Sequence, residues 1–254
     1  MFSVDDRRPC KPPTRRRSES KCEGMKRANT FLTLAAGILV LMGAPHLDAQ
    51  TSGGGSTSGK VVMLPKELEL RLAVNALPRD LRDGASILAL ESTGYVKART
   101  GTNPFTCLVS RRGGNFYPVC FDEEGSRTIL PAFADDAVLR LKGASDAEVE
   151  RQLVAGFEEG RYRPPARPGI AYMLSPATYL LEGGRLTRTP PHTMFYAPFL
   201  SNADIGGLPE KTAFVDRPGP HGMIIVIAGQ KEREALFAES QALVDEIERI
   251  IGLK

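Results

Sequence analysis

In Phe105-Thr-Cys-Leu-Val-Ser-Arg-Arg-Gly-Gly-Asn-Phe-Tyr-Pro-Val-Cys-Phe121, two apolar segments flank a glycine turn, and this stretch decides the fold. Short apolar runs bounded by Gly-Gly-Asn are typical of two β-strands joined by a tight turn. The pattern therefore predicts a β-hairpin. Cys107 and Cys120 stand thirteen positions apart, one in each predicted strand, so that their side chains can face each other across the hairpin.

An export signal precedes this hairpin. Lys26 and Arg27 lead into residues 30–43, an uncharged apolar run with the length of a signal-peptide core but too short for a comfortable membrane span. A small residue, Ala49, follows at a suitable distance for cleavage. We therefore assign residues 25–49 as a signal peptide. We expect a periplasmic or secreted protein without stable membrane insertion after cleavage.

The segments on either side of the signal peptide have distinct compositions. Residues 1–24 form a basic N-terminal extension, which we interpret as a start codon assigned too early; a long signal n-region and a functional basic arm are the alternatives. Residues 50–60 are rich in Gly and Ser and predict a flexible linker. Residues 61–254 then form a single globular domain.

Charge argues against one class of partner. Residues 1–49 contain nine of the 33 Lys and Arg and five of the 30 Asp and Glu side chains, so the formal net charge falls from +3 to −1 when they are removed. A nucleic-acid partner requires a surplus of basic side chains gathered on one face. We therefore expect no nucleic-acid partner.

Cys107 and Cys120 are the two cysteines that remain after signal cleavage. Disulfides form and persist in exported proteins, so we expect these two residues to form one. A metal-binding thiolate pair and a redox pair are weaker alternatives, because the spacing is not C-x-x-C.

The rest of the domain alternates helical and extended patterns. A capping box at Ser145 and Glu148 indicates a helix start, the proline-rich segment 160–169 indicates a break, and the apolar run 222–228 is expected to be a core strand. These patterns predict an α+β fold, a mainly antiparallel sheet with packed helices and a C-terminal helix. We expect helices over 65–77, 128–141, 146–159 and 231–251, and further strands over 85–91, 95–99, 170–174, 178–181 and 193–196.

Two histidines are the first candidates for chemistry. His192 and His221 each follow a proline-rich loop next to a predicted strand, where sites are often built. With Asp204 as a third ligand they form a weak metal-site alternative, since no H-E-x-x-H or comparable spacing is present. No sequence motif indicates a cofactor, and we expect none.

Glu124 and Ser126 are weaker catalytic candidates in the segment after the cysteine hairpin. Ser126 does not stand in G-x-S-x-G, and we interpret it as the N-cap of the following helix. Glu124 belongs to the acidic run 122–124, which we interpret as a solvated turn.

Four segments carry a resemblance to a known family: residues 105–111, 118–131, 168–175 and 192–198. Here the chain resembles a family of exported bacterial proteins of unknown function, over most of residues 65–228. The resemblance implies export and a single domain. It implies no activity, cofactor or catalytic residue.

The leading hypothesis from the sequence is an exported binding or accessory domain, whose partner is a small molecule or an envelope protein. The alternative is a small hydrolase-like or metal-assisted enzyme that uses His192 and His221. The two hypotheses separate on geometry, because catalysis requires both histidines to converge with a carboxylate in one cleft.

Overall fold

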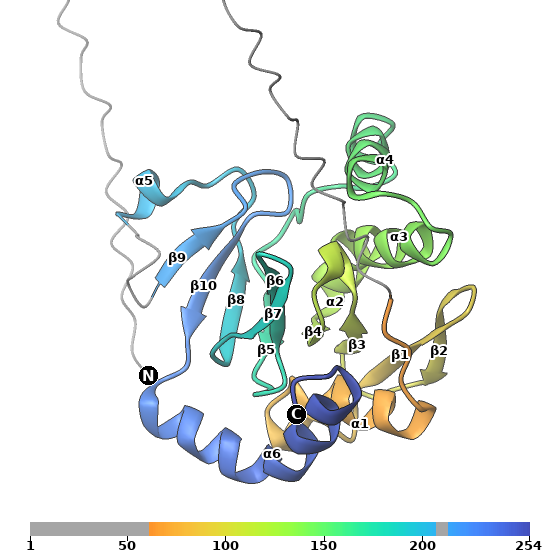
Figure 1. The fold of residues 1–254 in the computed structure, drawn as a ribbon. Helices are drawn as coiled ribbons and strands as arrows, with labels where there is room; N and C mark the ends of the chain where they lie inside the picture. Colours follow the sequence, from red (N-terminus) through yellow and green to blue (C-terminus); the bar gives the residue numbers. More distant parts are fainter. Residues whose placement is uncertain (1–60, 207–212) are drawn as a thin grey trace, which may run out of the picture. The chain divides into compact units, whose positions relative to one another are not determined.

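A computed structural model describes residues 61–206 and 213–254 of the chain (Figure 1). The predicted extension 1–24, signal peptide 25–49 and linker 50–60 lie outside the described residues. The strands are β1 (Ser86–Glu91), β2 (Gly94–Arg99), β3 (Thr106–Ser110), β4 (Tyr117–Phe121), β5 (Ile170–Met173), β6 (Tyr179–Glu182), β7 (Arg185–Arg188), β8 (His192–Tyr196), β9 (Ala213–Asp216) and β10 (Met223–Ile227). Eight of them form one sheet in the order β2-β1-β3-β4-β5-β8-β10-β9, and β6 and β7 form a separate two-stranded sheet.

The helices are α1 (Lys66–Asn75), α2 (Glu123–Thr128), α3 (Leu130–Leu141), α4 (Asp146–Glu158), α5 (Asn202–Ile205) and α6 (Gln230–Ile250), with 3-10 turns η1 (Arg79–Leu81) and η2 (Arg112–Gly114).

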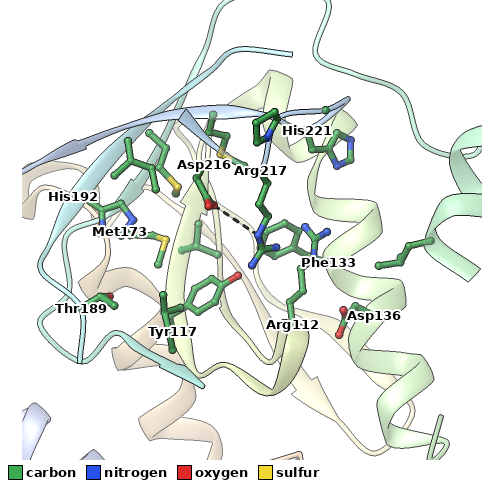
Figure 2. A pocket seen from close by; sticks show the side chains of 18 of the residues that line it. Arg112, Tyr117, Phe133, Asp136, Met173, Thr189, His192, Asp216, Arg217 and His221 are labelled. Atoms are coloured by element: carbon green, nitrogen blue, oxygen red, sulfur yellow. Dashed lines mark ion pairs between the residues drawn. The ribbon is translucent and has the colours of Figure 1, made fainter. Parts of the chain in front are cut away.

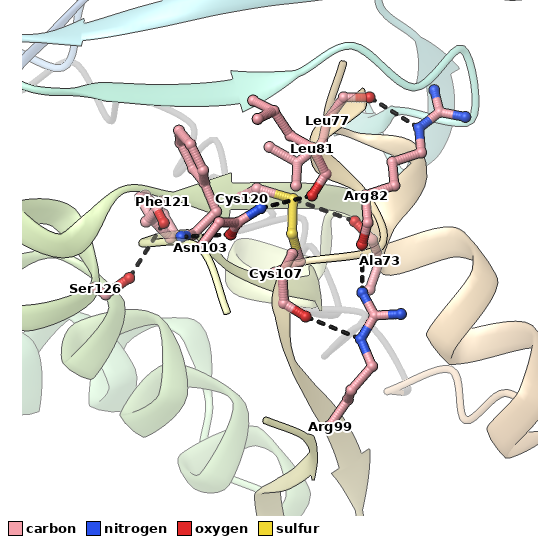
Figure 3. Close-up of a disulfide and its surroundings, with 12 residues drawn as sticks. Ala73, Leu77, Leu81, Arg82, Arg99, Asn103, Cys107, Cys120, Phe121 and Ser126 are labelled. Atoms are coloured by element: carbon pink, nitrogen blue, oxygen red, sulfur yellow. Dashed lines mark hydrogen bonds between the residues drawn. A yellow bond between two sulfur atoms is a disulfide. The ribbon is translucent and has the colours of Figure 1, made fainter. Parts of the chain in front are cut away.

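The cysteine hairpin is confirmed, and the strands predicted over 85–91 and 95–99 form a second hairpin. β1 pairs with β2 and β3 with β4, each antiparallel, and β1 joins β3 in parallel. Cys107 is directly opposite Cys120, with their sulfur atoms 2.08 Å apart, which is a disulfide distance (Figure 3). The mainly antiparallel α+β fold with a C-terminal helix agrees with the sequence pattern.

Side chains from the neighbouring loops hold backbone carbonyls around this disulfide (Figure 3). Arg99 donates from Nε to the carbonyl of Ala85 at 2.9 Å, and Asn103 donates from Nδ2 to the carbonyl of Leu81 at 2.7 Å. These bonds satisfy loop carbonyls that have no strand partner, and they fix the approach of the chain to the sheet.

One face of the sheet packs against α1 and α6. Cys107 and Val109 point to this face because alternate residues of a strand share a side. The buried side of α6 is confined to its C-terminal half, at Leu243, Val244 and Ile247, whereas Leu236 remains half-buried. The buried face of this helix is therefore shorter than the apolar pattern of its sequence predicts.

A buried ion pair ties α1 to the cysteine hairpin. Arg111 makes two hydrogen bonds to the carboxylate of Glu69, at 2.7 and 3.3 Å, and both side chains are 2% exposed. Arg111 also donates from Nε to the carbonyl of Val62 at 2.9 Å. Arg111, which follows β3 at the hairpin turn, is thus part of the core.

The other face of the sheet packs against α2 and α3, but only over part of its width. Leu108, Val119 and Phe121 lie under Ile129 and Phe133, and the Phe121 and Phe133 rings meet edge to face at 5.2 Å. The helices α3 and α4 then pack on each other beside the sheet. The strands β5, β8, β10 and β9 continue beyond α2 and α3 (Figure 1).

Some local predictions were wrong in detail. The helix predicted over 128–141 is α3, which begins at Leu130. The short helix α2 precedes it and was not predicted, and its N-cap is Asp122, whose carboxylate accepts from the Gly125 amide at 2.9 Å. Ser126 lies inside α2 and donates to the carbonyl of Phe121 at 3.2 Å. Asp122 precedes the helix by one residue, which is the position that an N-cap requires.

The capping residue of α4 is predicted correctly, since Ser145 accepts from the Glu148 amide at 3.3 Å. The apolar run 222–228 forms β10, but four of its five residues are half-buried because this strand is next to the sheet edge. Strands β7 and β9 were not predicted. Within residues 61–206 and 213–254, no helix is both long and apolar enough to cross a membrane.

Candidate functional site

A cavity of about 880 Å³ lies where the sheet extends past α2 and α3 (Figure 2). Its floor is formed by β5, β8 and β10, and one wall is formed by α3 and α4. The segment 216–221, which joins β9 to β10, forms the opposite wall. The cavity therefore occupies the part of this sheet face that the helices leave uncovered.

Strand alternation explains the apolar floor. Met194 of β8 pairs with Ile225 of β10, and both point into the cavity, whereas their sequence neighbours Phe195 and Ile224 point to the other face. Met173 and Met223 complete the floor. Methionine is unbranched and polarisable, so a methionine-rich floor adapts to apolar ligands of different shape.

The helical wall is also largely apolar. Phe133 of α3 and Val149, Leu153 and Phe157 of α4 line the cavity. The same wall also contains charged side chains that form ion pairs. Arg140 binds Asp136 at 2.7 Å and Asp146 at 2.6 Å. One arginine thus serves two of the three acids that α3 and α4 contribute to this wall, and the third is Glu150.

Two arginines stand apart from those ion pairs. Figure 2 shows Arg217 extending from the β9–β10 segment and Arg112 from the tip of the cysteine hairpin, and their guanidinium groups meet beside the Phe133 ring. The guanidinium carbon of Arg112 lies 4.8 Å from the centre of that ring. Burial lowers the pKa of Arg112, and the positive charge of Arg217 lowers it further.

The partners of the two arginines differ. Arg217 has a distant ion pair with Asp216, 3.7 Å from Nε to Oδ2, in which both side chains are about half exposed. In the part of the chain that the structure describes, the guanidinium of Arg112 has no hydrogen bond or ion pair, only its stacking on Phe133. The cavity therefore contains a positive charge without a carboxylate partner.

Arg217 also has an unusual backbone. Its φ angle is +50°, in the left-handed region that side-chain-bearing residues rarely adopt. Such conformations cost free energy and are found preferentially at functional sites. Here the residue with the left-handed backbone is one whose side chain lines the cavity.

Both candidate histidines line the cavity, but on opposite sides (Figure 2). His192 binds the carbonyl of Pro190 through Nδ1 at 2.8 Å, and His221 binds the carbonyl of Arg163 through Nε2 at 3.2 Å. Burial lowers the pKa of His192, and it lowers that of His221 to about 4. Both imidazoles are therefore neutral near pH 7, with one nitrogen of each bound to a backbone carbonyl.

Two polar atoms of the cavity wall are buried without a partner. They are Thr189 Oγ1 and His221 Nδ1, and no other side-chain nitrogen or oxygen of the described residues is both buried and without a hydrogen bond. Buried polar groups are nearly always satisfied, so an orphaned one calls for an explanation such as a ligand or ordered water. Both lie at this cavity.

The other predicted site residues lie elsewhere. Glu124, Ser126 and Asp204 do not line the cavity. Asp204 instead accepts from the amide and hydroxyl of Ser201, at 2.8 and 2.7 Å, and caps α5. In residues 61–206 and 213–254 no three His, Cys, Asp or Glu side chains are placed to hold a metal ion. His192, His221 and Asp204 therefore do not form the metal site that the sequence offered as an alternative.

Glu124 has a structural role rather than the solvated position predicted for it. Its side chain is 2% exposed and accepts from the Ala166 amide at 2.7 Å and from Arg127 at 2.7 Å. The hydrogen bond from Arg127, followed by that from Ala166, lowers the pKa of Glu124 to about 2. This carboxylate therefore anchors the proline-rich segment that leads to β5.

Comparison of the chain with protein-family models, with curated proteins and with solved structures finds no match.

The sequence analysis did not single out Arg112 and Arg217, the two arginines that lie together at the cavity. Arg112 follows another arginine at a hairpin tip, and only the fold separates the buried Arg111 from the cavity-lining Arg112.

Proposed function

We propose that the chain is an exported binding protein that holds an apolar small molecule in the cavity between its sheet and α3–α4. The observation that carries the proposal is the apolar floor of an 880 Å³ cavity, built from Met173, Met194, Met223 and Ile225. Ligand sites are typically concave and mostly apolar, with volumes of about 300–1,000 Å³ and a few convergent polar groups. The cavity has each of these properties.

Export is supported by the signal-like sequence of residues 25–49 and by the cysteine pair. A disulfide at the centre of the sheet persists in an oxidising compartment and is rare in the cytosol. A secreted or periplasmic carrier would meet apolar molecules that need protection from water.

Binding is better supported than catalysis. His192 and His221 lie on opposite sides of the cavity, and each uses one nitrogen on a backbone carbonyl. In the described residues, neither imidazole has a hydrogen bond to a carboxylate or a hydroxyl group. A general base needs a nucleophile or water within hydrogen-bond reach and a group that orients it.

The test compares two adjacent tryptophan substitutions on β10. Ile225 lines the cavity and Ile224 faces the opposite side of the sheet, and both side chains are half-buried. The neutral fluorescent probe N-phenyl-1-naphthylamine is titrated into purified protein. We expect saturable binding at one probe per chain for the unmodified protein and for Ile224→Trp, and at least a tenfold loss for Ile225→Trp.

Two outcomes would contradict the proposal. One is the absence of saturable binding to the unmodified protein. The other is an equal loss in Ile224→Trp and Ile225→Trp, since it would place the probe on the outer face of the sheet or attribute the loss to unfolding. Circular dichroism of both variants checks that the sheet is retained.

A further inference from the structure

Two guanidinium groups, those of Arg112 and Arg217, lie together at one point of the cavity wall. Asp136 and Asp146 share Arg140, at 2.7 and 2.6 Å. Asp216 approaches Arg217 at 3.7 Å. Arg112, next to Arg217, has no carboxylate partner among the described residues. Within the described part of the chain, Arg112 is thus a guanidinium without an ion-pair partner beside an apolar floor, and Asp136 and Glu150 act on its charge only at longer range.

The stacking of Arg112 on Phe133 makes this charge available for recognition. The guanidinium carbon lies over the ring, 4.8 Å from its centre, so the ring contacts the group on one side. The N–H donors of arginine point outward within that plane, and the planar fork matches the two oxygens of a carboxylate. The contact with Phe133 therefore restrains the group without using its N–H donors.

From this arrangement we infer that the ligand is a single-chain amphiphile with a carboxylate headgroup, which binds between Arg112 and Arg217 while its aliphatic chain lies over Met173, Met194 and Ile225. The inference rests on the proposed function, since it identifies the ligand class of the same cavity. A carboxylate is the complementary partner for a guanidinium that has no ion pair of its own among the described residues. A hydrogen-bonded carboxylate would also remove the cost of a half-buried arginine without a partner.

Two further acids of the cavity belong to its helical wall. Glu150 of α4 lines the cavity but is exposed, and Asp136 is engaged by Arg140. A cationic headgroup beside Phe133 would approach two arginines. A neutral headgroup would leave the Arg112 donors unsatisfied.

The experiment measures displacement of the neutral probe from purified full-length protein by four ten-carbon amphiphiles below their micelle concentrations: decanoate, decyl phosphate, decanol and decyltrimethylammonium. We expect decanoate to displace the probe at a concentration about tenfold lower than decanol, the size of a typical hydrogen-bonded charge interaction. Decyltrimethylammonium should be the weakest. Decyl phosphate should not exceed decanoate by as much as tenfold.

Variants locate the headgroup. Arg112→Gln should bring decanoate and decanol within about threefold of each other when both are measured on the same variant, and Arg217→Gln should act in the same direction. Arg161→Gln is the matched control, because Arg161 also stacks on an aromatic ring, 5.2 Å from the centre of Tyr162, but does not line the cavity. It should leave the decanoate preference unchanged.

The outcomes distinguish this inference from the proposed function. If the probe binds but decanoate shows no advantage over decanol, or the advantage survives Arg112→Gln, the inference is wrong and the proposed function stands. If decyl phosphate binds tenfold more tightly than decanoate, the carboxylate assignment is wrong. If the probe does not bind, the proposed function fails.

Discussion

Replacement of Arg217 by glycine should stabilise the protein relative to replacement by alanine. Arg217 has φ = +50°, and a left-handed residue with a β-carbon costs about 1–2 kcal/mol, whereas glycine adopts this conformation freely. Both variants remove the same ion pair with Asp216, which is half exposed and separated by 3.7 Å. Its contribution of about 0–1 kcal/mol therefore cancels in the comparison.

The expected difference is about 1 kcal/mol in favour of Arg217→Gly, because the greater freedom of glycine in the unfolded chain offsets part of the strain. For a domain of this size, that difference corresponds to about 3 °C in melting temperature. Urea denaturation followed by circular dichroism at several temperatures measures it directly. Both variants should lose the preference for decanoate over decanol.

The reasoning is refuted if Arg217→Gly is as unstable as Arg217→Ala or less stable. Such a result would show that the left-handed backbone at this position carries no strain. An increase in stability together with unchanged decanoate preference would instead separate the backbone from ligand recognition. In that case the strain would have no connection with the position of the guanidinium group.

Three further predictions concern the fold. Glu69→Gln should cost about 3–5 kcal/mol in urea denaturation, because it leaves Arg111 buried without its counter-charge; a loss below 1 kcal/mol would contradict this account. Replacing Cys107 and Cys120 together by alanine should lower the free energy of unfolding by about 3 kcal/mol, and an unchanged midpoint would count against a stabilising disulfide. The pKa of His221 falls from its usual 6.5 to about 4, so the unfolded chain binds this proton first and stability should decrease as the pH falls from 6.5 to 4. His221→Phe should reduce that loss, as measured by unfolding at stepped pH; an identical slope would oppose it.

The hairpins and the cysteine pair could be predicted because their determinants are local. The strand at residues 105–110, the glycine turn and the strand at residues 117–121 form one continuous segment, so pairing of Cys107 with Cys120 follows from the alternation alone. The start of α4 is equally local, since Ser145 caps an amide three residues away. Such signals need no knowledge of the rest of the chain.

The cavity could not be predicted, because it depends on which part of the sheet the helices leave uncovered. Arg112 and Arg217 are separated by more than a hundred positions and meet only through the strand order β4-β5-β8-β10-β9. The role of Glu124 was missed for the same reason, since its partner Ala166 belongs to a segment 42 positions away. A run of acidic residues is interpreted as solvent-exposed when the hydrogen-bond donors that bury it come from a distant part of the sequence.

The most direct test of the central claim follows the methionine methyl groups by NMR as decanoate is added to protein labelled at the methionine methyl carbon. Met173, Met194 and Met223 line the cavity, whereas Met63 is 44% exposed and lies outside it, so Met63 is an internal control. We predict that the three cavity methyl signals shift and saturate at one equivalent while the Met63 signal stays in place. Unchanged cavity signals, or a shift confined to Met63, would contradict ligand binding in this cavity.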